Sequence, residues 1–135
     1  MTISFFEDIF KYEKFPVEYE CYKQLKDLSH LNYVAIPWTQ ILNSHWLEFP
    51  GRQHRDFYFR QLSRVKLDQQ NNFTVCQHDS YMQLRDYLHH LNITKIFACA
   101  TFDYDKLEGI DIISMPYINT FDFKNCQKDI LISFI

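Results

Sequence analysis

The sequence predicts an α/β protein, a Rossmann-like three-layer sandwich in which helices flank a mostly parallel sheet. Near-continuous apolar runs alternate with helical patterns, as in parallel sheets buried on both faces. The 135 residues are 47% hydrophobic and 18% aromatic, which is typical of a packed domain. Only 2 glycines and 4 prolines occur, which excludes a low-complexity chain. We therefore expect one domain over residues 1–135, with right-handed crossovers between its strands.

The first half of the chain predicts a helix, a strand and two further helices. A helix begins at Pro16, because proline suits the first helical turn. Its apolar stripe consists of Val17, Cys21, Leu25 and Leu28. Residues 33–36 form a short apolar strand that Pro37 ends, and a helix is expected over Thr39–Leu47. A charged helix over residues 54–66 follows. Its expected inner face consists of Phe57, Tyr58, Leu62 and Val65.

The second half predicts three strands around one helix. The first strand spans Phe73–Cys76, and Asp79 or Ser80 can cap the helix that follows. The apolar stripe of this helix consists of Tyr81, Leu84, Leu88 and Leu91. The two later strands are expected over Lys95–Ala100 and Ile110–Met115.

The chain finishes on an apolar run, Asp129–Ile135, with no turn or helix after it to cover the run. This run is either an ordinary last strand or the mark of a truncated sequence, and the second interpretation is preferred.

Charge argues against nucleic acid as a partner. The formal net charge is −3, so no basic face is implied. The one basic cluster is interrupted by acidic and apolar residues, and a solvated helix face explains it. It comprises Arg52, His54, Arg55, Arg60, Arg64 and Lys66.

Targeting and cysteine patterns predict a cytoplasmic protein. No stretch approaches the length of a membrane span, and residues 1–11 lack the features of a signal peptide. The 4 cysteines are widely spaced and form no metal-binding pair, so neither a disulfide framework nor a zinc site is expected. The two glycosylation sequons, 72–74 and 92–94, are read as turns before strands.

Polar residues follow the expected strands at their carboxyl ends, where open parallel sheets bind ligands. Trp38 is a candidate for stacking on a sugar or base, and Gln77 and His78 are candidates for binding hydroxyls. Asp79 or Asp103 is a candidate general base that takes a proton from an attacking hydroxyl.

Each of these candidates also has a structural interpretation. Trp38 can plug the end of the sheet, and Asp79 can act as a helix cap. The D-x-D pattern of residues 103–105 matches a metal and nucleotide-diphosphate motif, but a chance match is expected in a chain this rich in aspartate. The scarcity of glycine excludes a glycine-built phosphate loop. No metal or cofactor is assigned to this domain.

Four segments resemble the N-terminal, Rossmann-like domain of exostosin-like glycosyltransferases, which have the GT-B fold. The segments are Val34–Thr39, Asn72–Asp79, Ile112–Pro116 and Lys128–Ile135, and the likeness covers about the last three-quarters of the chain.

The resemblance implies transfer of a sugar from a nucleotide-sugar donor to a glycan acceptor. In that fold the N-terminal domain binds the acceptor and a C-terminal domain binds the donor. We therefore expect catalytic roles for His78 and Asp79. Acceptor contacts are expected from Trp38, Thr39, Gln77 and Asp103. The donor and its domain, or a partner chain carrying it, lie outside this sequence, so we expect the isolated chain to be inactive.

Two other hypotheses remain open. The chain is either a non-catalytic Rossmann-like module that binds a nucleotide, sugar or protein, or an interaction subunit whose last strand pairs with another chain.

Overall fold

Parallel strands form two adjoining sheets in a computed structural model that describes residues 2–12, 15–44 and 54–117. The described strands are β1 (Ile3–Ser4), β2 (Val34–Ala35), β3 (Asn72–Cys76), β4 (Ile93–Ala98) and β5 (Asp111–Ser114). One sheet has the order β1-β2 and the other the order β3-β4-β5, and every strand pair in them is parallel.

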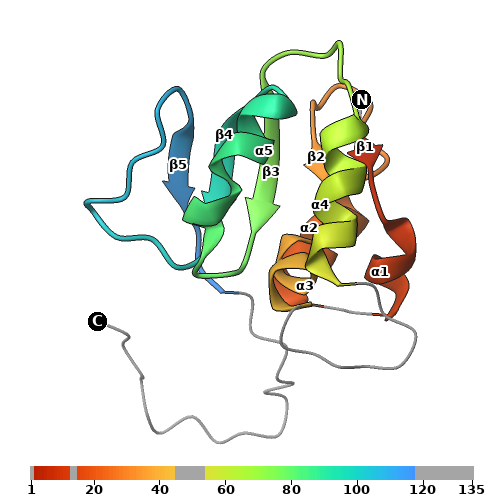
Figure 1. The fold of residues 1–135 in the computed structure, drawn as a ribbon, viewed down its shortest axis with the longest axis horizontal. Coiled ribbons are helices and arrows are strands. Elements are labelled where there is room, and N and C mark those ends of the chain that lie inside the picture. Colours follow the sequence, from red (N-terminus) through yellow and green to blue (C-terminus); the bar gives the residue numbers. More distant parts are fainter. Residues whose placement is uncertain (1, 13–14, 45–53, 118–135) are drawn as a thin grey trace, which may run out of the picture.

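A narrow seam joins the two sheets between β2 and β3. Tyr33 and Phe73 form a parallel bridge, and the Phe73 N–H donates to the Asn32 carbonyl at 2.9 Å. The Thr74 hydroxyl donates to the Val34 carbonyl at 2.7 Å, where a backbone ladder bond would otherwise lie. The strands therefore follow one another across the molecule in the order of the chain (Figure 1).

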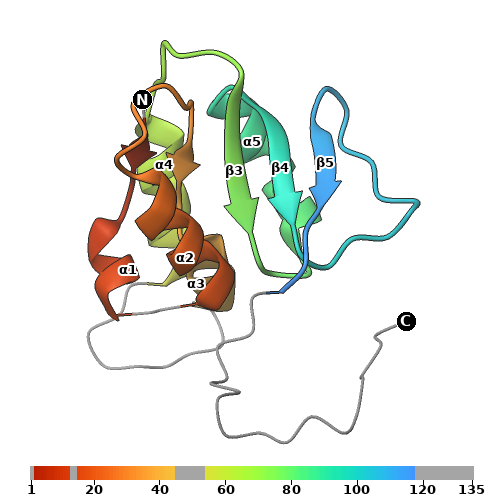
Figure 2. The ribbon, with the colours of Figure 1, turned by 180° about the vertical axis from the view of Figure 1, so that it is seen from behind.

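Helices cover both faces of this sheet and confirm the predicted three layers. One face carries α3 (Trp38–Asn43), α4 (Arg55–Arg64), the 3₁₀ turn η1 (Tyr81–Leu84) and α5 (Arg85–His90). The opposite face carries α2 (Pro16–Leu25), while α1 (Glu7–Tyr12) lies near the β1 edge (Figure 2).

The side-chain alternation of the strands divides the core between these two faces. Thr74 and Cys76 face α4 and α5, whereas Val75 faces α2. The larger core cluster includes the predicted stripe of η1 and α5. Each residue of that stripe is fully buried, namely Tyr81, Leu84, Leu88 and Leu91. The predicted inner face of α4 also packs into this cluster, through Tyr58 and Leu62 in particular.

The crossover from β1 to β2 differs in hand from the later ones. All the crossovers advance across the sheet in the direction from β1 to β5. The first passes through α2 on one face, whereas the later ones pass through α4 and α5 on the other face (Figures 1 and 2). Two parallel crossovers that advance in the same direction across a sheet but lie on opposite faces have opposite hands. The expectation of uniformly right-handed crossovers was therefore wrong for the first one. β1 is two residues long and carries little of the strand twist on which that rule depends.

Several element boundaries differ from those predicted. The helix expected over Thr39–Leu47 begins at Trp38 and ends at Asn43, and residues 45–47 lie outside the described part. β4 begins earlier than expected, at Ile93, because Asn92 turns the chain with a φ of 54°. β1 and α1 were not predicted, and residues 129–135 lie outside the described part.

Gly109 gives a first testable prediction. It has a φ of +73°, and an added Cβ would meet only the His89 Cε1 atom at 3.7 Å, an ordinary contact. We expect Gly109→Ala to lower the free energy of unfolding by about 1 kcal/mol, because alanine disfavours this backbone conformation. Urea denaturation measures the change, with the exposed Asn71→Ala (φ 56°) as a matched control of similar expected effect. A loss several times larger would show a steric cause instead.

Candidate functional site

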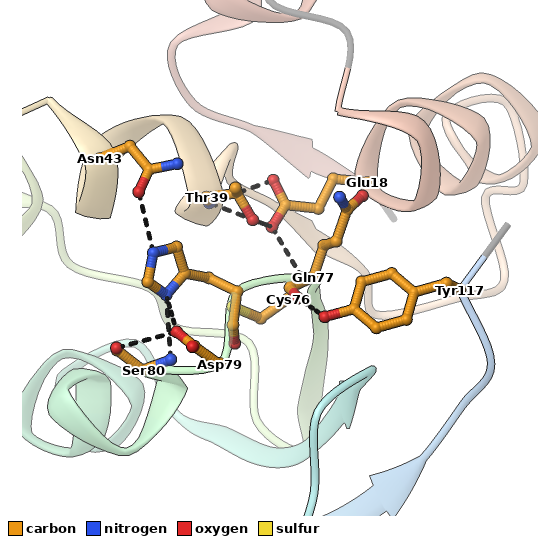
Figure 3. Close-up of polar contacts among 9 residues, drawn as sticks. Glu18, Thr39, Asn43, Cys76, Gln77, Asp79, Ser80 and Tyr117 are labelled. Carbon is orange, nitrogen blue, oxygen red and sulfur yellow. Dashed lines mark hydrogen bonds and ion pairs between the residues drawn. The ribbon is translucent and has the colours of Figure 1, made fainter. Parts of the chain in front are cut away.

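The predicted site residues 38–39 follow β2 and 77–79 follow β3, and the carboxyl ends of these two strands bring them into one region. Figure 3 shows Thr39, Gln77 and Asp79 there, together with Glu18 of α2 and Asn43 of α3. The sheet thus places polar side chains from α2, α3 and the turn after β3 at one edge, as the rule for parallel sheets predicts.

Glu18 is the centre of a buried clamp in this region. Its Oε1 accepts hydrogen bonds from the Thr39 hydroxyl at 2.7 Å, the Thr39 N–H at 3.1 Å and the Gln77 N–H at 3.0 Å. The Gln77 side chain also contacts α2: its Oε1 accepts from the N–H of Val17, in the first turn of that helix, at 3.0 Å. Because Thr39 and Val17 lie in first helical turns, the clamp satisfies donors that helices leave unpaired.

Two opposing effects act on the pKa of Glu18. The side chain is 1% exposed, and burial disfavours the charged carboxylate. Hydrogen bonds from Gln77 and Thr39 favour the charge, but burial is the larger effect and raises the pKa to about 7. Near neutral pH the clamp therefore holds a mixture of acid and carboxylate.

His78 is held on both sides of its ring. Its Nε2 lies 2.9 Å from the Asn43 Oδ1 at the end of α3. Its Nδ1 accepts from the Ser80 N–H at 2.9 Å and lies 3.0 Å from the Asp79 Oδ1. The Asn43 oxygen requires a proton on Nε2, so the neutral ring accepts through Nδ1. If the ring is protonated, the Asp79 Oδ1 is placed to accept a hydrogen bond from its Nδ1–H.

Asp79 is the accessible carboxylate of this group. Its side chain is 73% exposed, whereas that of His78 is 18% exposed. The Ser80 hydroxyl donates to the Asp79 Oδ1 at 3.0 Å, which orients the carboxylate beside the ring. The N-cap residue of η1 is Ser80 rather than Asp79, and the Ser80 side chain accepts no capping hydrogen bond. Chemically, Asp79 can take a proton from a bound hydroxyl.

Trp38 and Thr39 point into the protein rather than toward solvent. Trp38 is fully buried, and its Nε1 donates to the Thr74 Oγ1 at 2.9 Å. Thr39 is 4% exposed and donates to Glu18. These contacts match the structural interpretation of Trp38, a plug at the end of the sheet. Gln77 is half-buried in the clamp, and its carbonyl accepts from the Tyr117 hydroxyl at 3.2 Å.

Asp103 lies in the segment between β4 and β5, and its side chain is exposed. Its D-x-D partner Asp105 is occupied, because its Oδ2 accepts from the Tyr81 hydroxyl and from the Phe102 N–H. Among the residues that the structure describes, no group of three or more histidine, cysteine or acidic side chains is arranged to hold a metal ion.

The cysteines near the clamp are protonated thiols at neutral pH. Burial, with the nearby Glu18 charge as a further cause, raises the pKa of the Cys76 thiol and raises that of Cys99 to about 11. Burial also raises the pKa of the Cys21 thiol. None of the three therefore supplies a thiolate nucleophile.

Sequence reasoning missed Glu18, Asn43 and Tyr117. A signal for Glu18 was present, because it lies between Val17 and Cys21 of the predicted stripe and four residues before the buried Tyr22. A carboxylate on the apolar side of a helix indicates a buried polar contact. Asn43 and Tyr117 join the site only through the tertiary fold.

Comparisons of the chain with family models, with curated proteins and with solved structures find no match. No helix in the described ranges has the length and apolar character that crossing a membrane requires.

Proposed function

We propose that this chain is the acceptor-side half of a glycosyltransferase and that a glycan acceptor binds at the carboxyl edge of β2 and β3. The observation that carries the proposal is the exposed Asp79 carboxylate, oriented by Ser80 beside the half-buried His78. Support also comes from the parallel α/β fold, whose strand ends are the usual ligand sites, and from the resemblance to the exostosin-like N-terminal domain. The proposed location is the cytoplasm.

The proposed chemistry assigns a separate role to each group. Asp79 takes the proton of the acceptor hydroxyl while that oxygen attacks the anomeric carbon of the donor sugar. The bond from the sugar to the nucleoside diphosphate breaks, and the diphosphate leaves with the bonding electrons. Ser80 positions Asp79, and His78 in its protonated form stabilises the carboxylate. A C-terminal donor-binding domain or a partner chain supplies the nucleotide sugar, so we expect no transfer by these 135 residues alone.

The geometry changes the expected acceptor contacts. Gln77 holds the site through its side chain and through the carbonyl that Tyr117 contacts, and Tyr117 is 56% exposed. Trp38 and Thr39 support the site from within the core. Tyr117 therefore takes the place of Trp38 as the aromatic ring beside the acceptor.

Substitution of the two central residues tests the proposal. We expect His78→Ala and Asp79→Ala to weaken oligosaccharide binding by about tenfold each, the usual scale of a lost hydrogen bond to a charged group. Saturation-transfer NMR with maltohexaose, cellohexaose and chitohexaose measures the dissociation constants. Asp86→Ala, which removes an exposed carboxylate on α5, is the matched control and should bind as the unmodified chain does. Equal affinity in the Asp79 and Asp86 variants would contradict the proposed site.

The second candidate is a non-catalytic binding module. The burial of Trp38 and Thr39 favours it, because the end of β2 then offers no free ring or hydroxyl to an acceptor. In that case the same NMR experiment would show no oligosaccharide bound near Asp79. The strand-pairing form of this hypothesis depends on residues 129–135, which lie outside the described part.

A further inference from the structure

A hollow lies beside the start of α5. The cavity has a volume of about 590 Å³ and opens between α5 and the segment that joins β4 to β5, which loops outward in Figure 1. Its charged lining consists of Arg85, Asp105, Lys106, Glu108 and Asp111. Its apolar lining consists of Leu107, Ile110 and Ile112.

This lining suits a neutral polyhydroxylated ligand. Hydroxyl groups both donate and accept, so they can pair with the carboxylates and with the two cations, Arg85 and Lys106. The apolar wall can cover the C–H face of a sugar ring. Carboxylates outnumber cations in the lining, which disfavours a phosphate or another anion.

A turn that presents two aromatic rings adjoins the cavity. Phe102 and Tyr104 stack on each other with centroids 5.3 Å apart and planes 9° apart. Their exposed fractions are 60% and 76%, which makes them prominent exposed apolar residues in the described part of the chain. The faces of aromatic rings are electron-rich and attract the polarised C–H groups of a sugar.

The turn is held in place before any ligand binds. The Asp105 N–H donates to the Phe102 carbonyl at 2.9 Å, and the Asp105 Oδ2 accepts from the Phe102 N–H at 2.9 Å. The same carboxylate accepts from the hydroxyl of Tyr81 in η1, and Asp105 also lines the cavity. A turn whose backbone is already held loses little conformational freedom on binding.

We propose that this cavity and the Phe102–Tyr104 turn form a second carbohydrate subsite, which binds sugar units of the acceptor beyond the one at Asp79. This inference rests on the proposed function. The link between the two sites is η1: it begins directly after Ser80, which orients Asp79, and its Tyr81 is bonded to Asp105. We therefore expect a glycan of several units to contact both sites and a disaccharide to contact only the first.

The test compares chain lengths in variants of each site. The double variant Phe102→Ala/Tyr104→Ala should weaken binding of the hexasaccharide by about tenfold and change disaccharide binding less than about twofold. Arg85→Ala should act in the same direction. Maltohexaose, cellohexaose and chitohexaose, each beside its disaccharide, are the probes in saturation-transfer NMR. Leu28→Ala, an exposed apolar residue after α2, is the control, and circular dichroism verifies folding.

The outcomes separate the two proposals. A hexasaccharide-specific loss in the aromatic double variant, with a loss for both lengths in Asp79→Ala, supports both proposals. No effect of the aromatic change, with a loss in Asp79→Ala, overturns the second subsite and leaves the proposed function. A loss in the aromatic variant alone retains a carbohydrate site in the cavity and overturns the role of Asp79. Absence of binding by all the probes overturns both proposals.

Discussion

The free energy of unfolding of the unmodified protein is expected to fall by about 3 kcal/mol, because of Glu18, as the pH rises from about 4.5 to about 7. Burial raises the pKa of this carboxyl from 4.5 to about 7, so the folded state holds a proton that the unfolded state releases earlier. The raised pKa favours folding below about pH 4.5, and this contribution is lost through the window up to about pH 7.

Glu18→Gln isolates this contribution. The amide keeps an oxygen acceptor for Thr39 and Gln77, and its NH₂ takes the place of the acid O–H. We expect the variant to match the unmodified protein near about pH 5 and to exceed its free energy of unfolding by about 1–3 kcal/mol near about pH 8. Urea denaturation at a series of pH values gives both curves. Parallel curves for the two proteins would show that Glu18 does not titrate in this window.

Glu18→Ala should be most destabilising at low pH, where Glu18 contributes most to the stability of the unmodified protein. It removes the shared acceptor and leaves the Thr39 and Gln77 donors without it in a dry environment. The expected loss is about 3–5 kcal/mol near about pH 5, the scale on which breaking a buried charged contact acts. Near about pH 8 the loss should be about 3 kcal/mol smaller, because the unmodified protein has itself lost that contribution of Glu18. A loss of equal size at both pH values would show that Glu18 does not titrate in this window.

The sequence predicted the elements that have a local pattern and missed those that depend on distant partners. Apolar runs and helical stripes are local, so β3, α4 and α5 were found with their buried residues, including Leu84 and Leu88. β1 is two residues long and is defined by its pairing with β2, so no local pattern marks it. The hand of the first crossover likewise depends on the face that α2 covers, which the sequence pattern does not specify.

The candidate site was predicted by position and not by side-chain direction. The rule for parallel sheets correctly located Trp38, Gln77 and His78 at strand ends. Whether such a side chain turns inward depends on partners remote in sequence. Trp38 turns in because the Thr74 hydroxyl, 36 positions along the chain, accepts its N–H, and Gln77 turns in toward Val17.

Thr74→Val should destabilise the protein by about 2–4 kcal/mol although it changes the side-chain volume little. The Thr74 hydroxyl is fully buried at the seam between β2 and β3, where it accepts from the Trp38 Nε1–H and donates to the Val34 carbonyl. Valine leaves both groups unpaired. Since the backbone contacts at this seam are few, the lost hydroxyl also weakens the joint between the two sheets.

Thr74→Ser is the matched control, because it keeps the hydroxyl and removes one methyl group, at a cost of about 1 kcal/mol. A double-mutant cycle with Trp38→Phe then separates the two hydrogen bonds. When the indole N–H is already absent, Thr74→Val should cost about 1–2 kcal/mol less, because only the Val34 carbonyl remains to be left unpaired. Equal losses in the serine and valine variants would show instead that packing, and not the hydroxyl, holds the two sheets together.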